Sequence, residues 1–157
     1  NVIKGIKHTL IVDDTYNASP KSSISALKFL ERVKIAPGKR KWAVLGDMLE
    51  LGVYTEEGHR EVGKAMVDSG FNKLVTVGER AWNIAQAARD QGMKKGDVFH
   101  FSDNREAGKF VQSRIEQGDL IFIKGSQGAR MEKIVKELMA DPINAENLLV
   151  RQGEGWN

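Results

Sequence analysis

Short apolar runs alternate along the chain with longer stretches in which apolar residues recur at helical spacing. The runs predict strands at residues 8–12, 41–45, 73–77, 98–101 and 120–123. The longer stretches predict helices at residues 20–33, 55–69, 79–91, 104–117 and 129–139. Strands and helices in alternation indicate βαβ units, and nearly unbroken apolar strands fit a parallel sheet covered on both faces. The pattern therefore predicts an α/β fold: a doubly wound, mostly parallel sheet flanked by helices on both faces.

The two ends of the chain depart from this alternation. Residues 2–6 are apolar enough to predict an extra strand at the edge of the sheet. Near the C-terminus the helical pattern breaks at Pro142, and residues 148–150 (Leu-Leu-Val) are interpreted as a short strand or a docked arm. We therefore divide the chain into a domain at residues 1–140 and a tail at residues 141–157.

Composition excludes several classes of protein. The 157 residues fit one domain, and the contents of 41% hydrophobic and 29% charged residues are ordinary for a globular protein. A net charge of +3 gives no argument for nucleic acid, and the absence of cysteine excludes a disulfide framework and a thiolate zinc site. No apolar run approaches the roughly 20 residues of a membrane span. We expect no nucleic-acid or membrane partner, and the cytoplasm as the natural compartment.

Polar side chains gather where the first predicted strand ends. Two carboxylates, an aromatic hydroxyl and an amide follow it: Asp13, Asp14, Tyr16 and Asn17. A helix then starts at once, with Ser19 placed to cap it and Pro20 in its first turn. Nothing in the core of a fold requires this cluster, and ligands bind at the carboxyl ends of strands in open α/β sheets. We interpret it as the rim of a ligand site.

The second strand ends in a loop that two glycines bracket. Gly46 and Gly52 enclose Asp47, Met48 and Glu50. The loop is either part of the ligand site or a flexible connection with solvated acids, and the pattern alone leaves both open.

The fifth strand ends in Lys124, Gly125 and Ser126, directly before a predicted helix. A glycine-containing turn at a helix N-terminus suits an anion such as a phosphate or carboxylate. The alternative is a helix that Ser126 caps, which explains the serine but not a lysine at the end of a buried strand.

Other familiar signatures are missing from the sequence. It contains no G-x-x-x-x-G-K-[ST] loop to hold a triphosphate and no G-x-G-x-x-G after a strand. His8, His59 and His100 do not have metal-site spacing, so we predict no metal ligands, and we interpret His59 as a packing or capping residue. The chain starts at Asn1 without an initiator Met or a signal pattern, which we interpret as the start of a fragment or excised domain.

Four motifs, in order, resemble a known family. They are the D-D-T-Y-N-A-S-P of residues 13–20, the L-G-D-M-L-E-L-G of residues 45–52, His59 with Val62-Gly63, and Lys124-Gly125-Ser126 with Met131-Glu132. Together they resemble the C-terminal domain of the Mur ligases over about residues 1–140. The first two motifs set the chain apart from the folylpolyglutamate synthases, which share the domain type.

The resemblance implies a Rossmann-like domain, one of three in the whole ligase. In such ligases a central domain holds the P-loop and most contacts to ATP and Mg²⁺, and the first domain holds the UDP-sugar. The implied reaction joins D-alanyl-D-alanine to UDP-N-acetylmuramoyl-tripeptide through an acyl phosphate, for peptidoglycan precursor synthesis. The family suggests a monomer. We expect the isolated domain to be inactive and assign no catalytic residue to it.

The resemblance also implies roles for residues of this chain. Asp14 takes the position that contacts the nucleotide ribose, with Tyr16 and Asn17 beside the adenosine. The acceptor dipeptide or the acyl phosphate is expected to face the residues of the other two strand ends, Gly46, Asp47, Met48, Glu50, Lys124, Gly125 and Ser126.

The chain departs from the family pattern in two places. Ser19 stands where many members have Asn, and Gln127 stands where Arg often follows Lys-Gly-Ser. Arg130 is a candidate to supply that missing charge. The rival hypothesis is a non-catalytic Rossmann-like module that binds a nucleotide or small anion, and the missing glycine fingerprint argues against a dehydrogenase.

Overall fold

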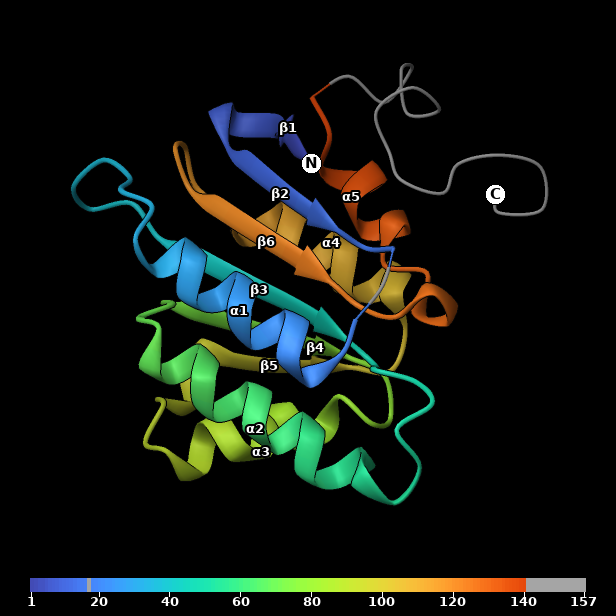
Figure 1. Ribbon diagram of the computed structural model, residues 1–157. Helices are drawn as coiled ribbons and strands as arrows, with labels where there is room; N and C mark the ends of the chain where they lie inside the picture. Colours follow the sequence, from blue (N-terminus) through green and yellow to red (C-terminus); the bar gives the residue numbers. More distant parts are fainter. Residues whose placement is uncertain (17, 141–157) are drawn as a thin grey trace.

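A six-stranded sheet forms the centre of the molecule (Figure 1). The computed structural model describes residues 1–16 and 18–140. In the sheet the strands lie in the order β1-β2-β6-β3-β4-β5, with β1 antiparallel to β2 and the other neighbours parallel. Their bounds are Val2–Lys4 (β1), Leu10–Asp14 (β2), Lys41–Gly46 (β3), Lys73–Val77 (β4), Val98–Phe101 (β5) and Leu120–Lys124 (β6).

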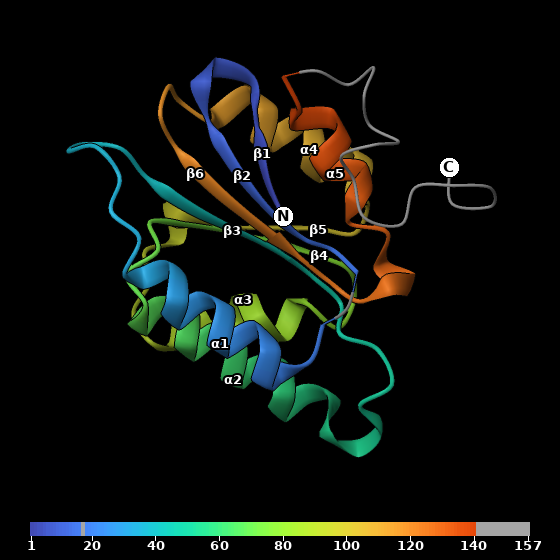
Figure 2. The same cartoon turned by 45° about the horizontal axis from the view of Figure 1, so that its top comes forward.

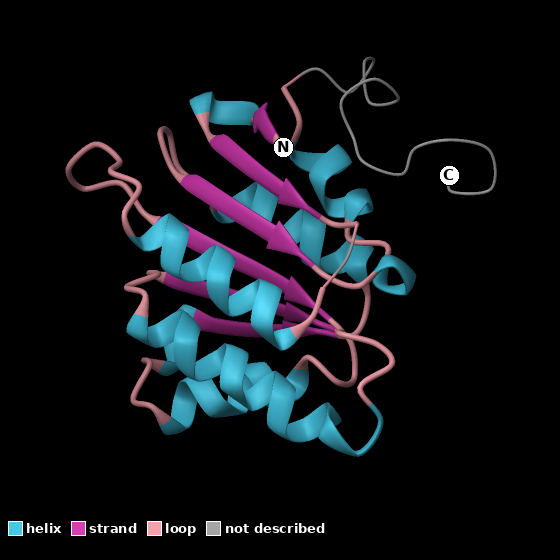
Figure 3. Ribbon diagram, in the orientation of Figure 1, coloured by secondary structure: helices cyan, strands magenta, loops and turns pink. Residues whose placement is uncertain are grey.

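Helices cover both faces of this sheet (Figures 2 and 3). One face carries α1 (Pro20–Glu31), α2 (Thr55–Asp68) and α3 (Trp82–Asp90), and the other carries α4 (Asn104–Arg114) and α5 (Glu132–Leu138). Short 3-10 turns lie at Ile6–His8, Gly52–Tyr54, Lys95–Asp97 and Gln127–Ala129. The predicted doubly wound α/β fold is confirmed.

The central strand β6 separates two apolar cores. Leu120 and Phe122 point into the core under α1, α2 and α3, whereas Ile121 and Ile123 point into the core under α4 and α5. Successive side chains of a strand point to opposite faces, so a strand covered on both sides must be apolar at every position. Lys124 is the first residue of β6 that breaks this rule.

The order of strands places β6 between β2 and β3, which are its neighbours in space although not in sequence. The chain leaves β2 and β3 toward the α1–α3 face, and it leaves β6 toward the opposite face (Figure 2). Loops that diverge in this way open a crevice at the carboxyl ends of the strands. The three polar strand ends of the sequence therefore lie side by side there.

Some element boundaries differ from the sequence-based predictions. The helix predicted at 129–139 begins only at Glu132, because Arg130 has a left-handed backbone (φ 54°) that ends a 3-10 turn. The helix predicted at 79–91 begins at Trp82, and the extra edge strand is Val2–Lys4. The predicted tail and its Leu-Leu-Val segment lie outside the described residues.

Candidate functional site

The two carboxylates at the end of β2 point to opposite faces of the sheet. Asp13 is buried, and its Oδ1 accepts hydrogen bonds from the backbone N–H (3.2 Å) and hydroxyl (2.7 Å) of Thr15. Asp14 points to the α1 face, and 44% of its side chain is exposed. Alternation along the strand therefore gives the neighbouring acids different roles: Asp13 fixes the turn and Asp14 is available at the rim.

Asp14 forms an ion pair with Lys124. The ammonium Nζ lies 2.6 Å from Asp14 Oδ2, and the two residues are direct partners in the parallel ladder of β2 and β6. Only 3% of the Lys124 side chain is exposed. The first and last motifs of the sequence thus meet in one contact.

The turn after β2 leads into α1 as the sequence predicts. Ser19 caps the helix by accepting a hydrogen bond from the backbone N–H of Ser22, and Pro20 occupies the first turn. Tyr16 is half exposed beside this turn. Asn17, predicted to lie near the adenosine, is outside the described residues.

Asp47 is built into the fold. Its Oδ1 accepts a hydrogen bond from the backbone N–H of Ala81 (2.7 Å), just before α3, and its Oδ2 lies 3.5 Å from an Arg80 guanidinium nitrogen. Gly78 has a φ of +110°, and a Cβ there would lie within 2.6 Å of the Asp47 carboxylate. The carboxylate therefore holds the strand-end loops of β3 and β4 together. The alternative interpretation, a flexible loop with solvated acids, does not hold for Asp47.

Met48 and His59 form a buried contact behind the loop. His59 is fully buried; its Nε2 accepts the backbone N–H of Met48 (3.0 Å), so Nδ1 must carry the proton that it donates to the carbonyl of Thr55 (2.6 Å). Burial lowers the pKa of His59 from 6.5, because it disfavours the charged ring. The interpretation of His59 as a packing or capping residue is confirmed.

Ser126 joins three strand ends. Its backbone N–H donates to the carbonyl of Asp47 (3.0 Å), and its hydroxyl accepts from the backbone N–H of Leu49 (2.8 Å) and donates to the carbonyl of Ala18 (3.4 Å). It caps no helix with its side chain, and a 3-10 turn follows it. The predicted α-helix therefore does not start directly after this turn but only at Glu132, and the alternative of a helix capped by the Ser126 side chain is wrong.

A polar pocket of about 300 Å³ opens beside this junction, lined by Ala18, Leu49, Glu50, Ser126, Gln127 and Gly128. Glu50 is exposed and has a left-handed backbone (φ 64°). Gly46 and Gly125 lie at the ends of β3 and β6, and a Cβ on either would come within 2.6 Å of the Met131 side chain. The glycines thus allow the strand ends and Met131 to pack closely.

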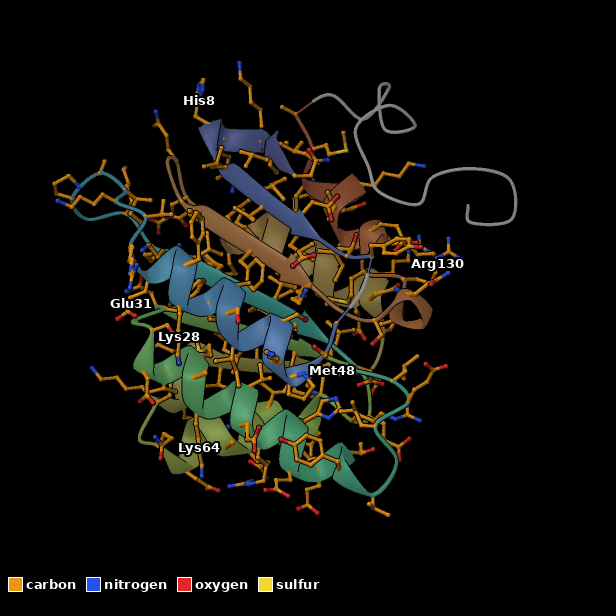
Figure 4. All side chains as sticks on the ribbon, viewed as in Figure 1. His8, Lys28, Glu31, Met48, Lys64 and Arg130 are labelled. Carbon is orange, nitrogen blue, oxygen red and sulfur yellow. The ribbon has the colours of Figure 1, made fainter. Side chains whose placement is uncertain are left out.

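Sequence reasoning missed one ion pair at the same edge, between Arg130 and Glu132. Glu132 is almost completely buried and accepts a hydrogen bond from Arg130 Nε, while the Asn104 amide donates to the carbonyls of Ala129 and Arg130 at 3.4 Å. Figure 4 shows Arg130 and Met48 at the carboxyl edge, with His8 and Glu31 at the opposite end. The available signal in the sequence was the spacing of Arg130 and Glu132, which places opposite charges two residues apart just before α5.

Other kinds of site are not formed by the part of the chain that the structure describes. Within residues 1–16 and 18–140, no three His, Asp or Glu side chains gather closely enough to hold a metal ion. Over the same residues, every helix is too short or too polar to cross a membrane.

The fold and the polar edge define a class: an open α/β domain with polar residues at three strand ends around β6, where ligands bind in folds of this kind. The family model described as "Mur ligase, glutamate ligase domain" matches residues 1–127. The chain belongs to this family.

Known relatives narrow the comparison further. The UDP-N-acetylmuramoyl-tripeptide–D-alanyl-D-alanine ligase of Bacillus subtilis is 36% identical over 134 residues, which cover 85% of this chain and 29% of that protein. The Escherichia coli ligase of the same name is 32% identical and is matched over 27% of its length. The chain therefore spans less than a third of these relatives.

Solved structures agree with this placement. A MurF ligase from Thermotoga maritima, in complex with ADP, matches with a TM-score of 0.69 at 28% identity, over 87% of this chain and 29% of that one. MurF from Acinetobacter baumannii matches with a TM-score of 0.74 at 28% identity, over 90% of this chain and 30% of that one.

Proposed function

We propose that this chain is the C-terminal domain of an ATP-dependent ligase that adds D-alanyl-D-alanine to UDP-N-acetylmuramoyl-tripeptide. In the proposed reaction the tripeptide carboxylate attacks the γ-phosphate of ATP to form an acyl phosphate, and ADP leaves. The amine of the dipeptide then attacks the acyl carbon, and phosphate leaves. The observation that carries the proposal is the meeting of the first and last motifs at the Asp14–Lys124 pair, at the same edge of the sheet as the polar pocket.

The nucleoside side of the site is the end of β2. Asp14 offers a half-exposed carboxylate that can accept hydrogen bonds from ribose hydroxyls, and Tyr16 is exposed beside it. Asn17 is proposed to complete this side. These residues orient the nucleoside, and the phosphate-binding loop is expected elsewhere in the whole ligase.

The acceptor side is the polar pocket beside Ser126. Glu50 lines it with an exposed carboxylate, which suits the cationic amine of a dipeptide before it is deprotonated for attack. Ser126 lines the pocket and holds the neighbouring loops through its hydrogen bonds. Gly46 and Gly125 leave room for Met131 to pack against the strand ends, and Met48 bonds to His59 behind the loop. Asp47 and Lys124 act through their contacts with neighbouring residues. Catalysis of this kind depends mostly on positioning.

The described residues do not fit a magnesium site, since no acidic cluster is present among them. We therefore derive no step through a metal held by this domain and propose that Mg²⁺ and the phosphates of ATP are held by another domain. Substrates such as ATP and a UDP-linked peptide place the proposed reaction in the cytoplasm. We propose that the ligase is a monomer, as the family suggests.

Two measurements test the proposal. The full-length protein should release phosphate only when ATP, the UDP-linked tripeptide and D-alanyl-D-alanine are all present, and Asp14→Ala should raise its KM for ATP. Isothermal titration of the isolated 157-residue chain with ATP should show no tight binding. An unchanged KM in Asp14→Ala contradicts the ribose contact.

The same titration distinguishes the ligase-domain proposal from the rival hypothesis of a non-catalytic Rossmann-like binding module. A self-sufficient nucleotide-binding module would bind ATP stoichiometrically as the isolated chain, and its binding would not depend on the UDP-linked peptide. That result would contradict the ligase-domain proposal.

A further inference from the structure

We infer that Lys124 is a positioning residue, which holds the Asp14 carboxylate for the nucleoside and does not itself contact the acceptor or the acyl phosphate. The inference rests on the proposed function, because the nucleoside contact of Asp14 is part of that proposal. It gives the lysine of the last motif a role different from the one that the family resemblance implies.

The strand register brings the two residues together. Asp14 and Lys124 are direct partners in the β2–β6 ladder, and direct partners in neighbouring strands point to the same face of the sheet. The Nζ–Oδ2 distance of 2.6 Å is that of a short, charge-assisted hydrogen bond. The pair is therefore fixed by the backbone of the sheet and not by a movable loop.

The two charges differ greatly in exposure. Lys124 lies on the central strand, where its other register partner is Leu45 of β3, and its side chain is 3% exposed. Asp14 lies nearer the sheet edge with 44% of its side chain exposed. A ligand can thus reach the carboxylate but not the ammonium, whose burial requires a charged or polar partner.

This asymmetry has a consequence for binding. A carboxylate that is already held in one orientation loses little conformational freedom when a hydroxyl binds to it. With Oδ2 committed to Lys124, Asp14 still has acceptor capacity to offer to a ribose hydroxyl. Lys124 therefore contributes to nucleoside affinity through Asp14.

The test uses Lys124→Met in the full-length ligase, a change that keeps the length of the side chain and removes its charge. We expect the KM for ATP to rise about tenfold, the size of one lost charge-assisted hydrogen bond, with kcat and the KM for D-alanyl-D-alanine unchanged. In the Asp14→Ala background, Lys124→Met should have no further effect on the KM for ATP, because no carboxylate remains to be held. Lys73→Met is the matched control, since it breaks a Lys–Asp pair (2.5 Å to Asp97) at the opposite edge of the sheet.

Three results would overturn the inference: an unchanged KM for ATP in Lys124→Met, a selective rise in the KM for the dipeptide or fall in kcat, or effects of the two substitutions that multiply. If Lys124→Met does not fold, Asp14→Ala is compared with Asp14→Ala/Lys124→Met. Equal KM values for ATP support the inference and a higher value in the double variant overturns it. If the wild-type enzyme shows no ATP-dependent ligation, the proposed function fails and this inference fails with it. If the wild type is active and only the Lys124 results differ from expectation, the inference alone fails.

Discussion

Asp119 and Asp14 show how a carboxylate differs between the amino and carboxyl edges of the same sheet. Asp119, directly before β6, is 1% exposed and accepts four hydrogen bonds: from the backbone N–H of Arg40 and Glu116, the Arg40 guanidinium and the Trp42 indole. Asp14, at the other end of the neighbouring strand, is 44% exposed and pairs with Lys124 alone among the described residues.

The difference separates a carboxylate that the fold saturates from one that keeps acceptor capacity toward solvent. A carboxylate whose acceptor sites are filled by the fold has nothing left to offer a ligand, whereas one held by a single donor can bind another. By this criterion Asp47, although it lies at the carboxyl edge, resembles Asp119, because its oxygens face the Ala81 N–H and Arg80. Acids at the carboxyl edge therefore differ in how much acceptor capacity the fold leaves to them.

The largest expected effect comes from Asp119→Ala. Four donors lose their acceptor in a buried site, so the free energy of unfolding should fall by about 3–5 kcal/mol. Urea denaturation of the chain measures this loss. Asp97→Ala, which removes a more exposed partner of Lys73, serves as control and should cost about 1 kcal/mol or less. If both variants lose the same free energy of unfolding, the buried, fully hydrogen-bonded Asp119 is no more important for stability than the more exposed Asp97, and the comparison fails.

The second test concerns the stability of the Asp14–Lys124 pair. Asp14→Ala takes the carboxylate from a buried ammonium, and adding Lys124→Met removes that ammonium. The double variant should therefore be more stable than Asp14→Ala, by about 1–3 kcal/mol. Thermal and urea unfolding of both variants measure the difference. A double variant that is less stable would show that Lys124 stabilises the fold independently of Asp14.

The smallest expected effect is a pH dependence of stability caused by His59. Both ring nitrogens of this residue at the carboxyl edge are hydrogen-bonded within the fold. Burial lowers its folded pKa below 6.5, so the unfolded chain binds a proton more readily than the folded chain. Its contribution to stability is present above pH 6.5 and is lost as the pH falls toward the folded pKa, by at most about 1.4 kcal/mol per unit.

Urea unfolding between pH 5 and 8 compares wild type with His59→Gln, and His8→Gln provides an exposed control. The wild-type free energy of unfolding should fall more steeply below pH 6.5 than that of His59→Gln. Parallel pH profiles for these two proteins would contradict a buried neutral His59.

Much of the fold could be predicted from the sequence, because a sheet covered on both faces requires nearly continuous apolar strands. Leu120–Lys124, Lys73–Val77 and Val98–Phe101 lie within one residue of their predicted bounds. The segment after β6 was mispredicted, because helical periodicity from residue 129 cannot reveal the left-handed backbone of Arg130.

The site could be predicted less completely. The sequence marked three polar strand ends that the fold brings to one edge, and the cap at Ser19 and the packing role of His59 were readable from local pattern. It grouped Asp13 with Asp14 and Asp47 with Glu50, although the fold buries Asp13 against Thr15 and holds Asp47 at the Ala81 N–H, while Asp14 and Glu50 stay more exposed. Which acid is engaged depends on donors from other strands and loops, and local sequence does not contain them.

The sequence by itself determined the α/β alternation, the polar strand ends and the resemblance to the Mur ligases, because apolar periodicity and motif order are local properties of a chain. Only the tertiary structure decided that β6 lies between β2 and β3, and that Lys124 therefore meets Asp14 across 110 residues of sequence. The reason is that strand order depends on how all the helices and strands pack together, and this involves segments far apart in the sequence. Register then assigns each charged side chain its neighbour and its exposure to solvent.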